Sequence, residues 1–182
     1  LFYYSAGIHP WYISEESLDN EFIKLQNALQ KIQILAVGEC GLDRLSAIDF
    51  KLQEKVFIKH IDLANQMAKP LIIHCVRAHL ETLRLLKDYQ ANVPVIFHGF
   101  NNNIELATRI IKDGFYLSFG ASAFNPHTET VINKVPLDNI FLETDDSKLS
   151  IQEIYEQVCK IKKIRLENLQ LQIQKNSKKV FK

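Results

Sequence analysis

Two histidines and two carboxylates stand in this sequence at the ends of short apolar runs. Glu39 follows ILAVG, His74 follows PLII, His98 follows PVIF, and Asp145 follows NIFLET. Imidazole nitrogens and carboxylate oxygens are the side-chain donors that divalent cations take in hydrolytic sites. We therefore predict a metal-dependent hydrolase site built from these four side chains.

Each of these residues also has an interpretation without a metal. A buried glutamate needs a partner or a proton, so Glu39 could form an ion pair with Arg44, Arg77 or a lysine on a helix face. A single histidine at a strand end is more often a packed residue than a ligand. Asp145 could belong to a solvated acidic turn. The combination of two histidines with two carboxylates at corresponding positions favours the metal site.

Four further residues lie close to these positions in the sequence. His9, in the segment GIHPW, is a candidate for a contact with a phosphate or a leaving group, and Trp11 could stack on a base or pack over the rim of the fold. Arg77 could grip an anionic substrate or form an ordinary salt bridge. Asp43 could order the loop after Glu39 or support a ligand through a hydrogen bond.

The elements that must position these residues alternate between strands and helices. Runs rich in Ile, Val, Leu and Phe predict buried parallel strands over residues 2–8, 34–38, 70–74, 94–98, 115–119 and 139–143. Amphipathic spacing predicts helices in the gaps: one capped by Ser14, then 49–68, 79–90, 102–113, and one or two in a basic tail over 151–182. His60 falls in one of these helical patterns, and we expect it to lie at the surface.

This βα alternation favours an α/β fold of the TIM-barrel type, because polar groups follow nearly every strand. A doubly wound open sheet is the alternative, although its site usually gathers at one switch point. Residues 1–182 are expected to form a single hydrolase domain. Since a closed barrel usually has eight strands, we expect one or two strands to precede Leu1.

Composition restricts the partners and the compartment only weakly. Lys+Arg number 22 and Asp+Glu 21, so the overall charge does not indicate nucleic acid or a membrane surface. Three cysteines without close pairing are typical of free thiols in a reducing cytoplasm. The sequence has no apolar run of membrane-spanning length, and no obligate protein partner is evident.

Several motifs together resemble a known family. GIHPW at 7–11, GECGLD at 38–43, IIHC at 72–75, HGF at 98–100, SFGAS at 118–122 and LETDD at 142–146 resemble the TatD-type metal-dependent hydrolases. This family includes the TatD-like DNases among the amidohydrolase-like TIM barrels. GECGLD is the most specific of the six.

The resemblance implies roles for individual residues. Glu39, His74, His98 and Asp145 would bind one or two divalent ions, Mg²⁺ or Mn²⁺ with Zn²⁺ as an alternative. Glu39 and Asp145 would be catalytic, Glu39 by bridging the ions and Asp145 by handling the proton of a metal-activated water. His9, Arg77 and Trp11 would contact substrate, and Asp43 would support the loop. The implied activity is a deoxyribonuclease that hydrolyses phosphodiesters at a 3′ end.

Two departures from the family pattern leave alternatives open. The His-x-His pair of the family's first strand has no counterpart here, so we expect it before Leu1. The usual Glu-Thr-Asp-Ser-Pro is replaced by Glu143–Ser147, with Asp at position 146. The alternatives are a non-catalytic or weakly metal-binding relative that acts as a scaffold, and a hydrolase of another phosphoester, a lactone or an amide.

Overall fold

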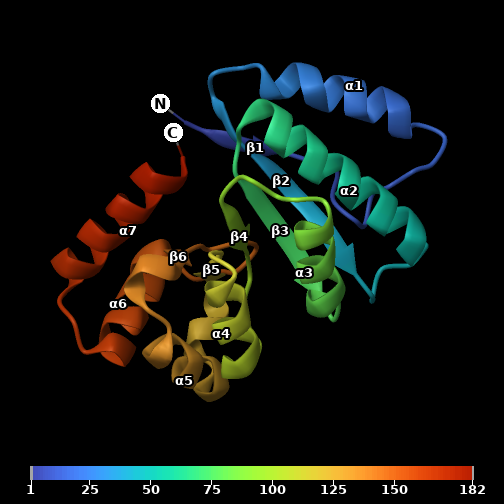
Figure 1. Cartoon of the computed structure of the whole chain (residues 1–182). Coiled ribbons are helices and arrows are strands. Elements are labelled where there is room, and N and C mark those ends of the chain that lie inside the picture. Colours follow the sequence, from blue (N-terminus) through green and yellow to red (C-terminus); the bar gives the residue numbers. More distant parts are fainter. Residues whose placement is uncertain (1, 182) are drawn as a thin grey trace. The chain divides into compact units, whose positions relative to one another are not determined.

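Strands alternate with helices along most of the chain, as the sequence predicts (Figure 1). The computed structural model describes residues 2–181, which divide into two compact units. The described part of unit 1 runs to Val95 and includes Phe181, and unit 2 runs from Ile96 to Val180.

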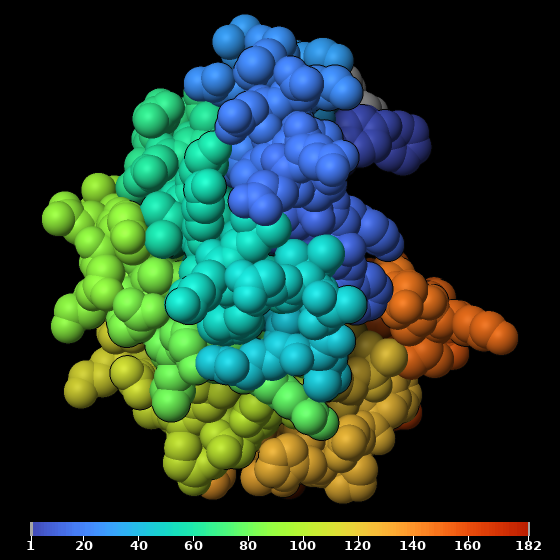
Figure 2. All heavy atoms as spheres, turned by 90° about the vertical axis from the view of Figure 1, so that its right-hand side faces the viewer, coloured from blue at the N-terminus to red at the C-terminus, as the bar shows by residue number. Residues whose placement is uncertain are grey.

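Unit 1 is built on three parallel strands that pair in chain order. Its elements are β1 (Tyr4–Ala6), α1 (Leu18–Leu29), β2 (Ile34–Asp43), α2 (Phe50–Met67), β3 (Leu71–Val76) and α3 (His79–Asp88). Helices α1 and α2 lie side by side, and Figure 2 shows them on one face of the unit, where Lys59 of α2 pairs with Asp19 of α1.

Unit 2 also pairs its strands in parallel and in chain order. Its elements are β4 (Val95–Phe97), which begins at the last residue of unit 1, α4 (Ile104–Lys112), β5 (Tyr116–Phe119), the 3-10 helix η1 (Ala121–Phe124), α5 (Pro126–Lys134), the 3-10 helix η2 (Leu137–Asn139), β6 (Ile140–Leu142), α6 (Ile151–Lys162) and α7 (Leu166–Val180). The basic tail therefore forms two helices. Chain-order pairing within each unit is the pattern of a barrel and lacks the order reversal of a doubly wound sheet.

The predicted strands and helices are found with shifted ends. Strand β2 continues to Asp43 instead of ending at residue 38, which puts two candidate site residues inside a strand. The prediction that Ser14 caps the first helix is wrong, because α1 begins at Leu18 with Ser17 in the N-cap position. Helix α5 was not predicted from the sequence. Its N-cap residue is Asn125, whose side chain accepts the N–H of His127.

The core of each unit consists of apolar side chains from the strands and from the inner faces of the helices. Side chains that are almost completely buried include Val37, Leu42, Phe57, Ile61, Leu71 and Ile73 in unit 1 and Phe97, Ile110, Leu117, Phe119, Ile132 and Ile140 in unit 2. Burying each of them contributes on the order of 1.5–3 kcal/mol. Among residues 2–181, no helix combines the length and apolarity needed to cross a bilayer.

His60 of α2 is buried in this core, which corrects the surface position expected from its helical pattern. Its Nε2 accepts the backbone N–H of Ile8 at 2.9 Å, and its Nδ1 lies 2.8 Å from the carbonyl oxygen of Val56. The Ile8 bond makes Nε2 the acceptor, so Nδ1 carries the proton and donates it to Val56. Burial disfavours the imidazolium and lowers the pKa of His60 to about 4, although the bond to Val56 opposes this shift.

This histidine makes stability depend on pH between about 6.5 and 4. In that range the unfolded chain binds a proton at His60 and the folded chain does not, so the free energy of unfolding falls as the pH falls. A pKa of about 4 corresponds to a loss of about 3 kcal/mol across the window. We expect urea denaturation to show this loss between pH 7 and pH 4, and His60→Gln to flatten it. An equally steep profile in the variant would contradict the assignment.

Candidate metal centres

A bulge in β2 directs the side chain of Glu39. Between Val37 and Cys40 the pairing with β3 shifts by one residue, so Gly38 and Glu39 lie opposite a single residue of β3. Bulges of this kind often re-aim a side chain beside a functional site. Position 38 has φ +151°, and a Cβ there would lie 2.5 Å from the carbonyl oxygen of Ile72. The close approach of β3 therefore requires glycine next to Glu39.

The first candidate centre lies in unit 1 and consists of His9, Glu39 and His74. One donor atom from each lies within 4.8 Å of the donor atoms of the other two. His9 follows β1, Glu39 lies in the bulge of β2, and His74 lies in β3. Two imidazoles and one carboxylate fit a divalent cation by donor chemistry. The structure thus brings together two residues predicted as ligands with one predicted to contact substrate.

Asp43 fixes the orientation of His74. The Oδ2 of Asp43 lies 3.0 Å from Nε2 of His74 and accepts the indole N–H of Trp11 at 2.6 Å, and its Oδ1 accepts the N–H of Leu45 at 2.7 Å. Burial alone raises the pKa of Asp43, but the hydrogen bonds from Trp11, His74 and Leu45 outweigh it and leave this pKa below its usual value. An ionised Asp43 places the proton of His74 on Nε2, so the lone pair is on Nδ1, the nitrogen that can coordinate a cation.

The neutral ring of His9 also carries its proton on Nε2, but this nitrogen faces Glu39. Its Nδ1 accepts the backbone N–H of Trp11 at 3.2 Å, which leaves the proton of the neutral ring on Nε2. This Nε2 lies 3.8 Å from Oε2 of Glu39. In this conformation His9 presents a donor toward the centre, which supports its predicted role in contacting substrate more than a role as ligand.

The second candidate centre lies in unit 2 and consists of His98, Glu143 and Asp145, whose donor atoms also lie within 4.8 Å of one another. His98 directly follows β4 and Glu143 directly follows β6. Asp145 is exposed, with φ 48°, so the chain has left the extended conformation there. One imidazole and two carboxylates again fit a divalent cation, with a harder donor set than in unit 1.

Glu143 is the site residue that the sequence analysis does not single out. Its Oε1 accepts the N–H of Gly99 at 2.6 Å and lies 3.5 Å from Nδ1 of His98. Burial raises its pKa, but hydrogen bonds from His98 and Ser118, with that of Gly99, leave the pKa below its usual value. Its place directly after an apolar strand, like that of His98, is the sequence signal that could have identified it.

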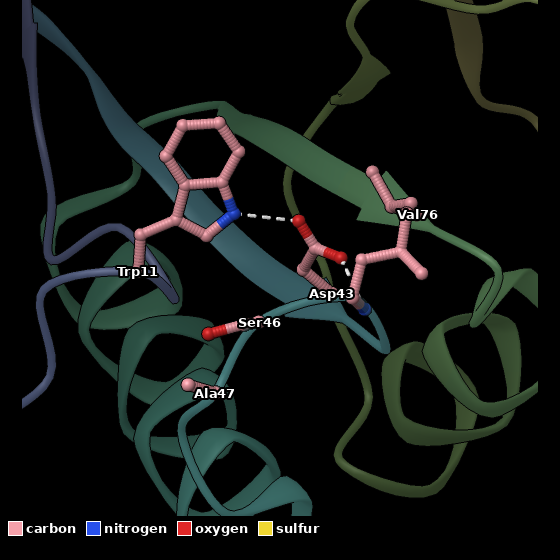
Figure 3. Close-up of a pocket in the computed structure, with 6 residues that line it drawn as sticks. Trp11, Asp43, Ser46, Ala47 and Val76 are labelled. Atoms are coloured by element: carbon pink, nitrogen blue, oxygen red, sulfur yellow. Dashed lines mark hydrogen bonds between the residues drawn. The ribbon is translucent and has the colours of Figure 1, made fainter.

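The remaining predicted residues lie around the unit 1 centre or next to it in the chain. The side chain of Trp11 is 53% exposed, and its ring lies beside Asp43 (Figure 3). Arg77 directly follows β3 and is exposed, with φ 52°. Arg44 pairs with Glu81, which argues against the alternative that Arg44 is the partner of Glu39.

Parallel strands with imidazole and carboxylate groups at or near their carboxyl ends define the class of (β/α)-barrel metal-dependent hydrolases. Comparison with known families gives the particular family. The family model described as TatD related DNase matches residues 1–182, and the chain belongs to this family.

Two curated relatives show how much of a family member the chain represents. It is 29% identical to the uncharacterized metal-dependent hydrolase MJ1582 of Methanocaldococcus jannaschii, over 99% of this chain and 76% of the relative. It is 34% identical to the Vairimorpha ceranae protein named "Putative deoxyribonuclease TATDN1 homolog", over 85% of this chain and 55% of the relative. The chain therefore spans little more than half of some relatives.

A solved structure confirms the predicted fold class. The crystal structure of YjjV, a TatD homologue of Escherichia coli K12, superposes with a TM-score of 0.87 at 26% identity, over 98% of this chain and 76% of that one. A TatD family hydrolase of Entamoeba histolytica gives a TM-score of 0.84 at 19% identity, over 97% and 73% of the two chains, and supports the fold alone.

Asp43→Asn tests the link between this carboxylate and the unit 1 centre. Trp11 and His74 both donate to Asp43, so an amide N–H₂ group in place of one oxygen would face a donor. Loss of such an outer partner typically weakens metal binding by roughly 10–100-fold. We expect that loss for one class of Mn²⁺ sites when free Mn²⁺ is titrated by electron paramagnetic resonance. Asp19→Asn, at an exposed carboxylate of α1, is the control. Equal Mn²⁺ affinity in both variants would contradict the assignment.

Proposed function

We propose that this chain is a TatD-type deoxyribonuclease that hydrolyses phosphodiesters at the 3′ end of DNA. The observation that carries the proposal is the presence of a group of imidazole and carboxylate donors in each unit, each donor in the carboxyl-terminal half of a parallel strand or within a few residues after one. The description of the family and the name of the Vairimorpha ceranae relative support deoxyribonuclease activity.

Two sets of residues would hold the cations. Glu39 and His74 would bind one in unit 1, and His98, Glu143 and Asp145 would bind one in unit 2; Mg²⁺ and Mn²⁺ suit the carboxylates, and Zn²⁺ suits the imidazoles. When bound, such a cation supplies Lewis-acid stabilisation of charge on phosphate oxygens and lowers the pKa of water.

The chain's own side chains would perform the remaining steps. The Nε2–H of His9 donates to a phosphate oxygen, and the guanidinium of Arg77 binds phosphate as a two-pronged donor. A carboxylate oxygen of Asp145 accepts the proton of the attacking water. Asp43 holds His74 in its orientation, and Glu143 does the same for His98 while it remains ionised.

The proposal extends to the organisation and location of the protein. We propose that residues 1–182 act as one hydrolase domain, which the match of the family model to all of them supports. DNA is the proposed partner. A cytoplasmic location is supported by the free thiols Cys40, Cys75 and Cys159.

Asp145→Asn tests the function directly. The chain should release mononucleotides from single-stranded DNA labelled at the 5′ end by stepwise shortening from the 3′ end, and EDTA should abolish this release. Loss of a residue that takes the proton should reduce the rate by roughly 10²–10⁴-fold.

The adjacent Asp146→Asn removes a neighbouring exposed carboxylate and should leave the rate within about twofold. Undiminished EDTA-sensitive cleavage in Asp145→Asn would exclude Asp145 from catalysis. Cleavage of a lactone or an amide with no release of nucleotides would exclude the deoxyribonuclease.

A further inference from the structure

A pocket of about 340 Å³ opens in unit 1 next to the first candidate centre. It is lined by Trp11, Asp43, Leu45, Ser46, Ala47 and Val76 (Figure 3). This volume lies at the lower end of the range of roughly 300–1,000 Å³ for small-molecule sites. Four of the six lining residues are apolar, so the pocket suits a small, flat, weakly polar group.

Trp11 provides an aromatic wall whose orientation is fixed. Its indole N–H donates to Oδ2 of Asp43 at 2.6 Å, and Figure 3 shows this nitrogen directed at the carboxylate. The ring meets His9, Tyr12 and His74 at interplanar angles of 81°, 75° and 76°. All three are edge-to-face contacts, so none of these three rings stacks parallel to the indole.

The loop that supplies Asp43, Leu45, Ser46 and Ala47 to the lining is held equally firmly. Gln53 of α2 accepts the N–H of Asp43 and donates to the carbonyl oxygens of Asp43 and Ile48, which ties both ends of the loop over residues 43–48 to the helix. The hydroxyl of Ser46 donates to the carbonyl oxygen of Pro10 and accepts the N–H of Ile48. A pocket whose walls are already ordered binds a ligand at a lower entropic cost.

We propose that this pocket is the nucleobase subsite of the protein, in which a base of the substrate strand stacks on Trp11. The inference rests on the proposed function, because a base subsite is expected here only if the neighbouring centre acts on DNA. One carboxylate oxygen, Oδ2 of Asp43, contacts both Trp11 and His74. A base stacked on the indole would thus lie within a few ångströms of His74, a candidate metal ligand. The sugar and phosphate attached to that base would then lie beside the candidate metal centre.

Recognition in this pocket rests on shape and stacking. Its polar groups, the carboxylate of Asp43 and the hydroxyl of Ser46, already hydrogen-bond within the protein. Every nucleobase has a flat aromatic face, so stacking on an indole tolerates all four bases. The subsite would therefore position the strand without selecting its sequence.

The single tryptophan of the chain reports directly on this pocket. Thymidine 5′-monophosphate, which has no phosphodiester to cleave, should quench the fluorescence of Trp11 in the presence of Mg²⁺. Deoxyribose 5-phosphate, which lacks the base, should bind at least about tenfold more weakly, as expected for loss of one stacked base. Equal quenching by both compounds, or none by the nucleotide, would overturn the subsite.

A pair of variants tests the location. Ala47→Leu places a larger side chain at an exposed position of the pocket lining and should weaken nucleotide quenching at least about tenfold. Ala68→Leu makes the same exchange at the exposed far end of α2 and should leave it unchanged. Equal quenching in both variants would place the nucleotide elsewhere.

The outcome is separable from that of the proposed function. DNA hydrolysis without nucleotide quenching would retain the enzyme and reject the subsite. Quenching that Ala47→Leu abolishes, in a chain that does not hydrolyse DNA, would retain the subsite and reject the deoxyribonuclease.

Discussion

The carboxylate of Asp43 is the group on which the arrangement of unit 1 depends. It is buried, with only 2% of the residue exposed, and such a charge is tolerated only where hydrogen bonds replace water. Three donors supply them, from Trp11, His74 and Leu45. Each of these donors belongs to a different segment. The single ionised carboxylate of Asp43 therefore holds the loop after β1, strand β3 and the loop after β2 together.

The same strand carries the charge and the bulge. Strand β2 pairs with both β1 and β3, and its bulge lies in the pairing with β3. The extra residue at Gly38 and Glu39 turns one carboxylate toward His9 and His74, while Asp43, four residues further on, holds His74 from the other side. One strand therefore contributes both a candidate ligand and the group that orients its neighbour.

In unit 2 a less buried carboxylate, that of Glu143, orients the histidine. Glu143 accepts the N–H of Gly99 and contacts His98, so it orients the histidine and belongs to the candidate centre itself. Asp145 leaves the strand direction and remains exposed. Unit 1 places Glu39 and His74 in the carboxyl-terminal halves of β2 and β3, whereas unit 2 places His98 and Glu143 directly after β4 and β6. In both units the donors thus lie toward the carboxyl ends of parallel strands, where side chains can converge.

Local features of the sequence were enough to predict the strands in order, the helices apart from α5, the fold class, and most of the residues that lie in the two candidate centres, because an apolar run followed by a polar residue can be recognised without distant contacts. How those residues group was set only by the packing of the folded chain. The bulge at Glu39 depends on the pairing of two strands, the burial of His60 depends on its contact with Ile8, and the role of Glu143 depends on a backbone N–H 44 residues away. Contacts between distant segments leave no periodic pattern in a sequence, since they are set by packing rather than by neighbouring residues.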